Sequence, residues 1–98
     1  MTAIIKSPGR PAFTREIENS LKTLQDLVGG YIEPVRLPGG ICMIVNEEGK
    51  LLGLKPNFRL EHDLIVGTVV FVATSGEDFC GLSVSQENFI WRMMSWVV

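Results

Sequence analysis

The chain has 98 residues, of which 46% are hydrophobic and 20% charged, with a formal net charge of −2. A chain of this length is expected to form one domain over residues 1–98, because either half would be too small to bury a core. The slightly negative charge and the scattered basic residues provide no field for nucleic acid, so no nucleic-acid partner is expected.

Cysteine and histidine are too few and too dispersed for a common metal site. The chain has two cysteines, Cys42 and Cys80, and one histidine, His62. Three- and four-ligand zinc sites need more of these residues at close spacing, so neither a metal nor another cofactor is expected. The start lacks signal-peptide features, and the longest apolar run, residues 64–73, is too short to span a membrane. These features predict a cytoplasmic protein with reduced thiols and no membrane contact.

The first third predicts two short strands and a helix. Ala3–Ile5 is apolar and ends at a Ser-Pro-Gly turn, and Ala12–Arg15 can form a second strand. An amphipathic helix is then predicted from Glu18 or Asn19 to Val28, with Asn19 as its N-cap. Its apolar residues recur at helical spacing, at Ile17, Leu21, Leu24 and Val28.

Two glycine pairs, Gly29-Gly30 and Gly39-Gly40, raise the question of a phosphate-binding loop. Phosphate loops precede a helix, because backbone amides and the positive end of the dipole lie at the helix N-terminus. The first pair follows the predicted helix, where glycine commonly ends a helix. The second pair lies between two apolar runs, Tyr31–Leu37 and Ile41–Val45, and predicts a hairpin turn. Both pairs are therefore interpreted as structural.

The second half predicts further strands. A polar turn at Asn46–Lys50 returns the chain into Leu51–Leu54, and Lys55–Arg59 is expected to be irregular because of its proline and asparagine. Leu64–Thr74 is apolar on both faces and predicts a central strand with a bulge at Gly67. A short strand is expected at Phe79–Leu82.

The last element is predicted to be a helix over Gln86–Trp96 with Ser85 as its N-cap. It is apolar around much of its circumference, more than one core face requires. The surplus apolar surface favours a homo-oligomer or a partner groove. The interface residues expected on this helix are Phe89, Trp91, Met94 and Trp96.

These elements predict an α+β fold, with a bent, mostly antiparallel sheet of about five to six short strands and two packed helices. The motifs Val28-Gly29-Gly30-Tyr31-Ile32-Glu33 and Asn46-Glu47-Glu48-Gly49 resemble a small, uncharacterised domain-of-unknown-function family frequent in phages and plasmids. The resemblance covers roughly residues 3 to 94. It implies a mobile-element context, in which small proteins disable host defence by capturing a host protein or a nucleotide signal.

A ligand site is expected where polar residues of these motifs and their neighbours converge. An aromatic ring can stack on a base, and arginine can bind phosphate through two hydrogen bonds. The alternative interpretation is that the asparagines only set turn geometry and the tyrosine is half buried. The expected ligand-binding residues are Tyr31, Glu33, Asn46, Asn57 and Arg59.

No catalytic residues are assigned. His62 lies between Glu61 and Asp63, which is more typical of a solvated turn than of a general base. A nucleophilic pair of Cys80 and His62 would need contact that the sequence does not indicate. The function predicted is a non-catalytic phage accessory protein in the host bacterial cytosol that sequesters a small nucleotide-derived immune signal. The alternatives are a protein–protein inhibitor acting through the apolar C-terminal helix and, less favoured, a small hydrolase.

Overall fold

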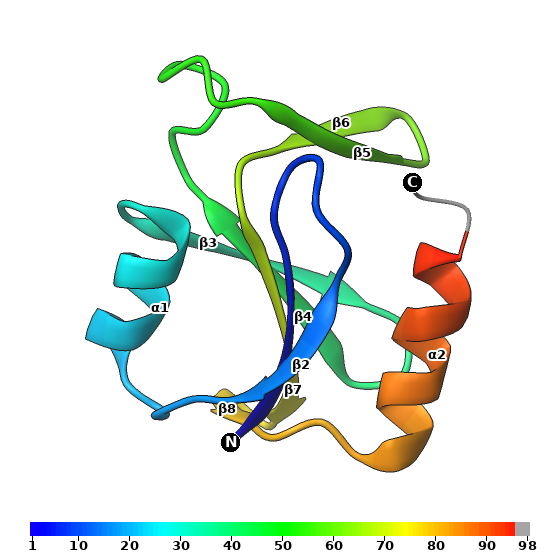
Figure 1. Ribbon diagram of the computed structural model, residues 1–98. Coiled ribbons are helices and arrows are strands. Elements are labelled where there is room, and N and C mark those ends of the chain that lie inside the picture. The colour runs from blue at the N-terminus through cyan, green and yellow to red at the C-terminus, as the bar shows by residue number, and fades with distance from the viewer. Residues whose placement is uncertain (96–98) are drawn as a thin grey trace.

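The computed structural model describes residues 1–95 and contains a curved sheet with one helix on each side (Figure 1). The elements follow one another in the order β1 (Thr2–Lys6), β2 (Phe13–Glu16), α1 (Leu21–Val28), β3 (Ile32–Leu37), β4 (Ile41–Asn46), β5 (Pro56–Leu60), β6 (Asp63–Val66), β7 (Val69–Ser75), β8 (Asp78–Cys80) and α2 (Val84–Met94).

The main sheet has six strands, and every pairing in it is antiparallel. Five strands lie in the order β2-β1-β7-β4-β3, and β8 pairs with the C-terminal half of β7. A separate two-stranded sheet is formed by the hairpin of β5 and β6. The fold class predicted from the sequence, α+β with a mostly antiparallel sheet and two packed helices, is therefore confirmed.

The strand residues alternate between two apolar cores, one on each face of the sheet. On one face, Ile5 and Val70 pack with Leu24 and Val28 of α1. On the other, residues such as Phe71 pack with α2 and with the β5–β6 hairpin. This division follows from the two-residue period of a strand, which directs successive side chains to opposite faces. The hairpin thus covers part of the sheet that α2 leaves open (Figure 1).

The N-cap residues of both helices lie one or two positions away from the predicted ones. The N-cap of α1 is Ser20, whose side chain accepts a hydrogen bond from the Thr23 N–H, while the predicted cap Asn19 donates to the Phe79 carbonyl instead. The helix ends at Gly29 in the left-handed conformation, as expected. For α2 the cap is Ser83, not Ser85, because Ser83 forms a reciprocal capping box with Gln86.

The run predicted as one central strand, residues 64–74, is divided between two sheets. Gly67 has a φ of +75°, and a Cβ at this position would lie 2.8 Å from Cδ1 of Leu54. The chain therefore turns at Gly67, so that β6 belongs to the hairpin and only β7 is central. The signal for a bulge was present in the sequence, but the full change of sheet was not predicted.

The segment around Asn57 was also predicted wrongly. Lys55–Arg59 was expected to be irregular, yet Pro56–Leu60 forms β5, with a register shift between Pro56 and Phe58. Proline is tolerated at the first residue of a strand, and Phe58 anchors the strand by burial in the core. Residues 51–53 form turns, and Leu51 is largely open to solvent at 88% exposure.

Within residues 1–95, neither helix is long and apolar enough to cross a membrane.

Candidate functional site

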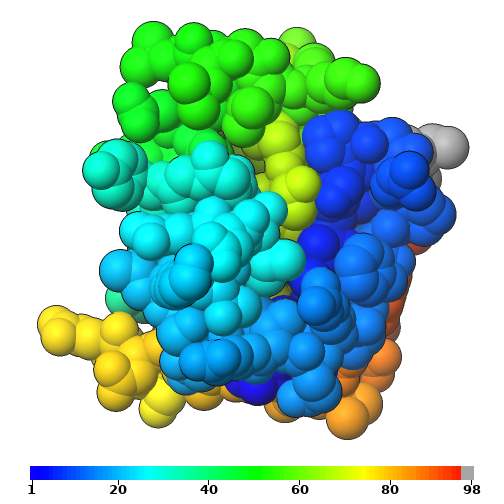
Figure 2. Space-filling model, turned by 60° about the vertical axis from the view of Figure 1, so that its left-hand side comes forward, coloured from blue at the N-terminus to red at the C-terminus, as the bar shows by residue number. Residues whose placement is uncertain are grey.

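The five residues expected to bind a ligand are distributed over more than one place in the structure. Tyr31 and Asn46 line one shallow pocket, and Glu33 and Asn46 line a second, while Asn57 and Arg59 line neither of them. Tyr31 is 65% exposed, in the loop between α1 and β3. Figure 2 shows this face, where the cyan surface of α1 meets the green surface of the β4–β5 loop and β5. Ligand contact by these residues remains a prediction.

Asn46 has a structural role that uses both polar atoms of its side chain. Its Nδ2 donates to the Val28 carbonyl at 3.1 Å, and its Oδ1 accepts from the Glu48 N–H at 2.8 Å. The side chain is buried, so these hydrogen bonds satisfy an amide that would otherwise be costly to desolvate. Asn46 therefore connects the end of α1 to the turn after β4.

Asn57 connects the β5–β6 hairpin to the main sheet through hydrogen bonds of its side chain. Its Nδ2 donates to the carbonyls of Lys6 and Gly67, both at 2.8 Å, and its Oδ1 accepts from Lys6 Nζ at 3.0 Å. One side chain thus joins β5, the end of β1 and the bend after β6. Arg59, two residues further along β5, is exposed.

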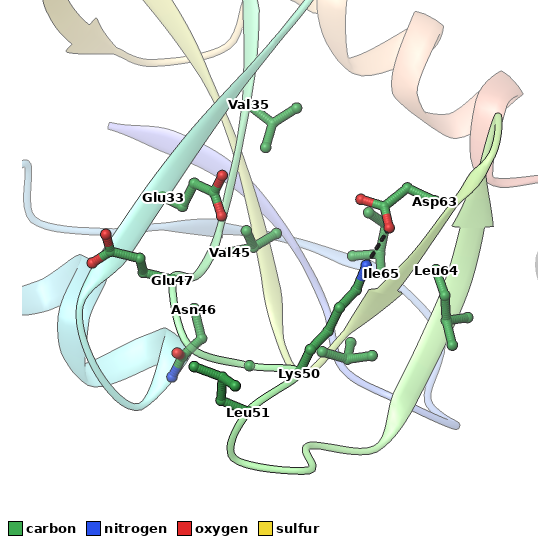
Figure 3. Close-up of a pocket in the computed structure, with 12 residues that line it drawn as sticks. Glu33, Val35, Val45, Asn46, Glu47, Lys50, Leu51, Asp63, Leu64 and Ile65 are labelled. Carbon is green, nitrogen blue, oxygen red and sulfur yellow. Dashed lines mark hydrogen bonds and ion pairs between the residues drawn. The ribbon is translucent and has the colours of Figure 1, made fainter.

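The pocket that contains Glu33 is a groove between β3, β4 and β6, with a volume of about 300 Å³ (Figure 3). Lys50, in the β4–β5 loop, reaches across to Asp63 on β6 and forms an ion pair with it. We call this pocket the acidic groove. Its charged lining residues are Glu33, Glu47, Lys50 and Asp63, and its apolar lining residues include Val35, Val45, Leu51, Leu64, Ile65 and Val66.

The charges of the acidic groove are unsuited to phosphate. Three carboxylates against one ammonium leave a net charge of −2, and the ammonium of Lys50 is already paired with Asp63. The Lys50 hydrogen bond holds the pKa of the Asp63 carboxyl below its ordinary value of 3.8, so Asp63 is ionised at neutral pH. Like charges disfavour binding, so a nucleotide phosphate would be repelled here.

A second cavity has the opposite charge. It lies between the loop that joins β1 to β2 and the last turn of α2, with a volume of about 470 Å³. We call it the basic cavity, and its lining residues include Lys6, Arg10, Pro11, Ala12, Trp91 and Met94. Lys6 and Arg10 were not singled out from the sequence as ligand-binding residues, and Trp91 and Met94 were expected at an interface instead. The available signal was a lysine that continues the apolar run Ala3–Ile5 directly before a Ser-Pro-Gly turn.

Lys6 is an unusual feature of the basic cavity, because its residue surface is only 3% exposed. Its ammonium donates to the Ser7 carbonyl at 2.8 Å and to Asn57 Oδ1 at 3.0 Å, and both acceptors are uncharged. Among residues 1–95, no carboxylate lies within ion-pair distance of it. Burial lowers the pKa of Lys6 from its ordinary value of 10.5. A lysine has three N–H donors, so one remains after these two contacts.

The expected interface residues on the last helix have different environments. Phe89 is 43% exposed and Trp91 is 38% exposed, whereas Met94 is buried in the core of its own chain. Trp96 lies outside the described residues. Self-association through this helix remains a prediction.

The nucleophilic pair of Cys80 and His62 is not formed. His62 lies in the β5–β6 turn and Cys80 lies in β8, at opposite ends of the molecule (Figure 1). Cys42 is buried in β4, and burial raises the pKa of its thiol, which keeps it protonated and unreactive. No group of three or more potential metal ligands occurs within the described part of the chain.

Comparison with known protein families assigns the chain to a family. A family model described as a domain of unknown function, DUF3846, matches residues 1–95. The chain belongs to the DUF3846 family. The resemblance noted in the sequence is therefore confirmed at the level of a family of unknown function. No curated protein and no solved structure matches the chain.

Proposed function

We propose that this DUF3846 protein is a non-catalytic binding protein that sequesters a small nucleotide-derived ligand in the basic cavity. The proposal depends chiefly on Lys6, a residue only 3% exposed whose ammonium has only uncharged partners among residues 1–95. A buried charge is costly unless an opposite charge accompanies it. An anionic ligand would supply that charge and use the remaining donor.

The other lining residues fit the remaining parts of a nucleotide. Arg10 provides a guanidinium that can bind a phosphate through two parallel hydrogen bonds. Trp91 provides a ring on which a base can stack, and Pro11, Ala12 and Met94 add apolar walls. The volume of about 470 Å³ is within the range of small-molecule sites, roughly 300–1,000 Å³.

The biological role that we propose is counter-defence by a mobile element such as a phage. The support is the resemblance of the Val28–Glu33 and Asn46–Gly49 motifs to a family frequent in such elements. Removing a nucleotide immune signal from the host cytosol requires binding only, and the residues that line the cavity within the described part include no histidine, cysteine or carboxylate.

Calorimetry with the full chain tests this proposal. The titrants are AMP, ADP-ribose and cyclic di-AMP, with adenosine as the uncharged control. At least one nucleotide should bind while adenosine does not. Arg10→Ala should weaken binding at least about tenfold, because a charge-assisted hydrogen bond is worth about 1.5–3 kcal/mol. Arg15→Ala, which alters an exposed arginine of β2 outside the cavity, should change affinity less than twofold.

Tryptophan fluorescence provides a second readout. In a Trp96→Phe background Trp91 is the single tryptophan, so its quenching by the bound base reports stacking directly. If none of the three nucleotides binds, or if Arg10→Ala and Arg15→Ala reduce affinity equally, the proposal is wrong.

The second candidate is a protein–protein inhibitor or adaptor that acts through α2. The favouring observation is the exposed apolar surface of this helix, at Val84 (72% exposed) and Phe89. Phe89 also borders a small apolar pocket with Pro38 and Ile41. Phe89→Ser separates the two functions, because it should abolish capture of a partner or self-association and leave nucleotide affinity unchanged. Sedimentation velocity and calorimetry on the same variant measure both.

A further inference from the structure

We propose that the acidic groove is a second binding site, which takes a basic, extended segment of a partner protein. The groove is separate from the basic cavity and shares no lining residue with it. It runs between β3 and β4 on one side and β6 on the other, and neither helix lines it (Figure 3). The inference goes beyond the nucleotide site and does not depend on it.

The first argument is charge complementarity. Glu33 on β3 and Glu47, directly after β4, form no ion pair with any cation of residues 1–95. Figure 3 shows both carboxylates on the side of the groove opposite the Lys50–Asp63 pair. Uncompensated carboxylates on one side of a groove attract arginine and lysine side chains, and carboxylates pair with arginine in bidentate geometry.

The second argument is the apolar surface within the same groove. Val35, Val45 and Leu64 are only partly buried, which leaves apolar area between the charged residues. Leu51 also lines the groove and is 88% exposed, and the adjacent pocket adds Leu52 and Tyr31, at 59% and 65% exposure. A cluster of large exposed apolar side chains bordered by charge is typical of a protein-binding surface.

The third argument concerns the shape of the occupant. β3 is the last strand of the main sheet, and β6 pairs only with β5 among the described strands, so each has one edge without a partner strand. Pro34 interrupts the row of N–H donors on β3, which restricts uncontrolled strand addition but leaves carbonyl acceptors. An extended segment that alternates cationic and apolar side chains matches both the charges and the apolar lining. A second copy of this chain is disfavoured, because it carries the same net charge of −2.

Fluorescence anisotropy with a labelled peptide of four Arg-Val repeats tests the proposal, and a peptide of four Glu-Val repeats is the control. The Arg-Val peptide should bind, and the Glu-Val peptide should not. The variant Glu33→Gln/Glu47→Gln should weaken binding at least fivefold. The matched variant Glu77→Gln/Asp78→Asn removes two exposed carboxylates far from the groove, in and before β8, and should change affinity less than twofold.

Chemical shift mapping shows where the peptide binds. Amide signals of Val35, Val45 and Leu64 should move on addition of the Arg-Val peptide, while those of Arg10 and Trp91 should not. Equal loss of affinity in the two double variants, or shifts confined to other surfaces, would overturn the proposal in favour of non-specific attraction. A dimer in sedimentation velocity that Leu51→Ser dissociates would overturn it in favour of a second copy as the occupant.

Discussion

The basic cavity and the acidic groove carry opposite charges, and these charges are held in different ways. Lys6 is buried, and its ammonium is fixed by Ser7 and Asn57. Glu33 and Glu47 are exposed and form no ion pair among residues 1–95. From this comparison we expect Lys6 and its hydrogen-bond partners to contribute to the stability of the fold, whereas Glu33 and Glu47 can be replaced without loss of stability. The following variants test this difference.

The largest effect is expected from Asn57→Ala. It removes three hydrogen bonds and leaves the Lys6 and Gly67 carbonyls without their donor. Losing buried partners costs about 1–3 kcal/mol each in the worst case, so we expect the free energy of unfolding to fall by about 3 kcal/mol. Urea denaturation measures it. Asn19→Ala, which removes one exposed hydrogen bond, is the control and should cost less than about 1 kcal/mol. Similar losses for both variants would contradict the role of Asn57.

Lys6→Met is expected to separate binding from stability. It removes the cost of burying a charge but leaves two acceptors unpaired, so the free energy of unfolding at pH 7 should change by only about 1 kcal/mol. Nucleotide binding should nevertheless be lost. Denaturation measures the free energy of unfolding, and calorimetry on the same preparation measures the nucleotide affinity. Retained nucleotide affinity would show that Lys6 is not part of the site.

The free energy of unfolding of the unchanged protein should depend on pH in a way that the free energy of unfolding of Lys6→Met does not. The pKa of Lys6 is lowered on folding, so between that pKa and 10.5 the unfolded chain holds a proton that the folded chain has released. The free energy of unfolding therefore rises with pH in this window, and below it the burial cost is present in full. Because Lys6→Met lacks this group, the free energy of unfolding of the unchanged protein should rise relative to that of Lys6→Met as the pH rises toward 10.5. A difference that stays constant with pH would refute the lowered pKa.

In the groove, Lys50→Met should raise the pKa of Asp63 toward its ordinary value of 3.8, since the hydrogen bond from Lys50 is the main cause of the lowering. Stability that arises from a lowered carboxyl pKa is present above the ordinary value and lost as the pH falls through the lowered one. Carbon-detected NMR titration of Asp63 measures the shift. An unchanged pKa in the variant would show that the ion pair is absent in solution.

The smallest effect is expected from Glu33→Gln/Glu47→Gln. Surface substitutions without a structural partner usually change stability by less than about 0.5 kcal/mol. The melting temperature of this variant should therefore match that of the unchanged protein, which thermal denaturation will show. A large loss would mean that the groove carboxylates are structural and would remove the contrast with the cavity.

The sequence predicted those parts of the fold that local patterns determine. The helical period of Leu21, Leu24 and Val28 and the hairpin at Gly39-Gly40 are both present in the structure. Strand β5 was missed, because Phe58 is buried against residues far away in the chain, which the local sequence does not reveal. The basic cavity was missed for the same reason. Lys6 and Trp91 are 85 positions apart, and no spacing rule in one sequence brings a strand end and a helix end together.

The bend at Gly67 has a mechanical consequence for the hairpin that lines the groove. The Gly67 N–H donates to the Lys55 carbonyl at 2.8 Å, so the strands entering and leaving the hairpin are tied at its base. Asn57 adds a second tie at the same level, to the Gly67 carbonyl. Because the hairpin is closed at this end, we expect that any widening of the groove would move β5 and β6 together and displace the turn at His62 most.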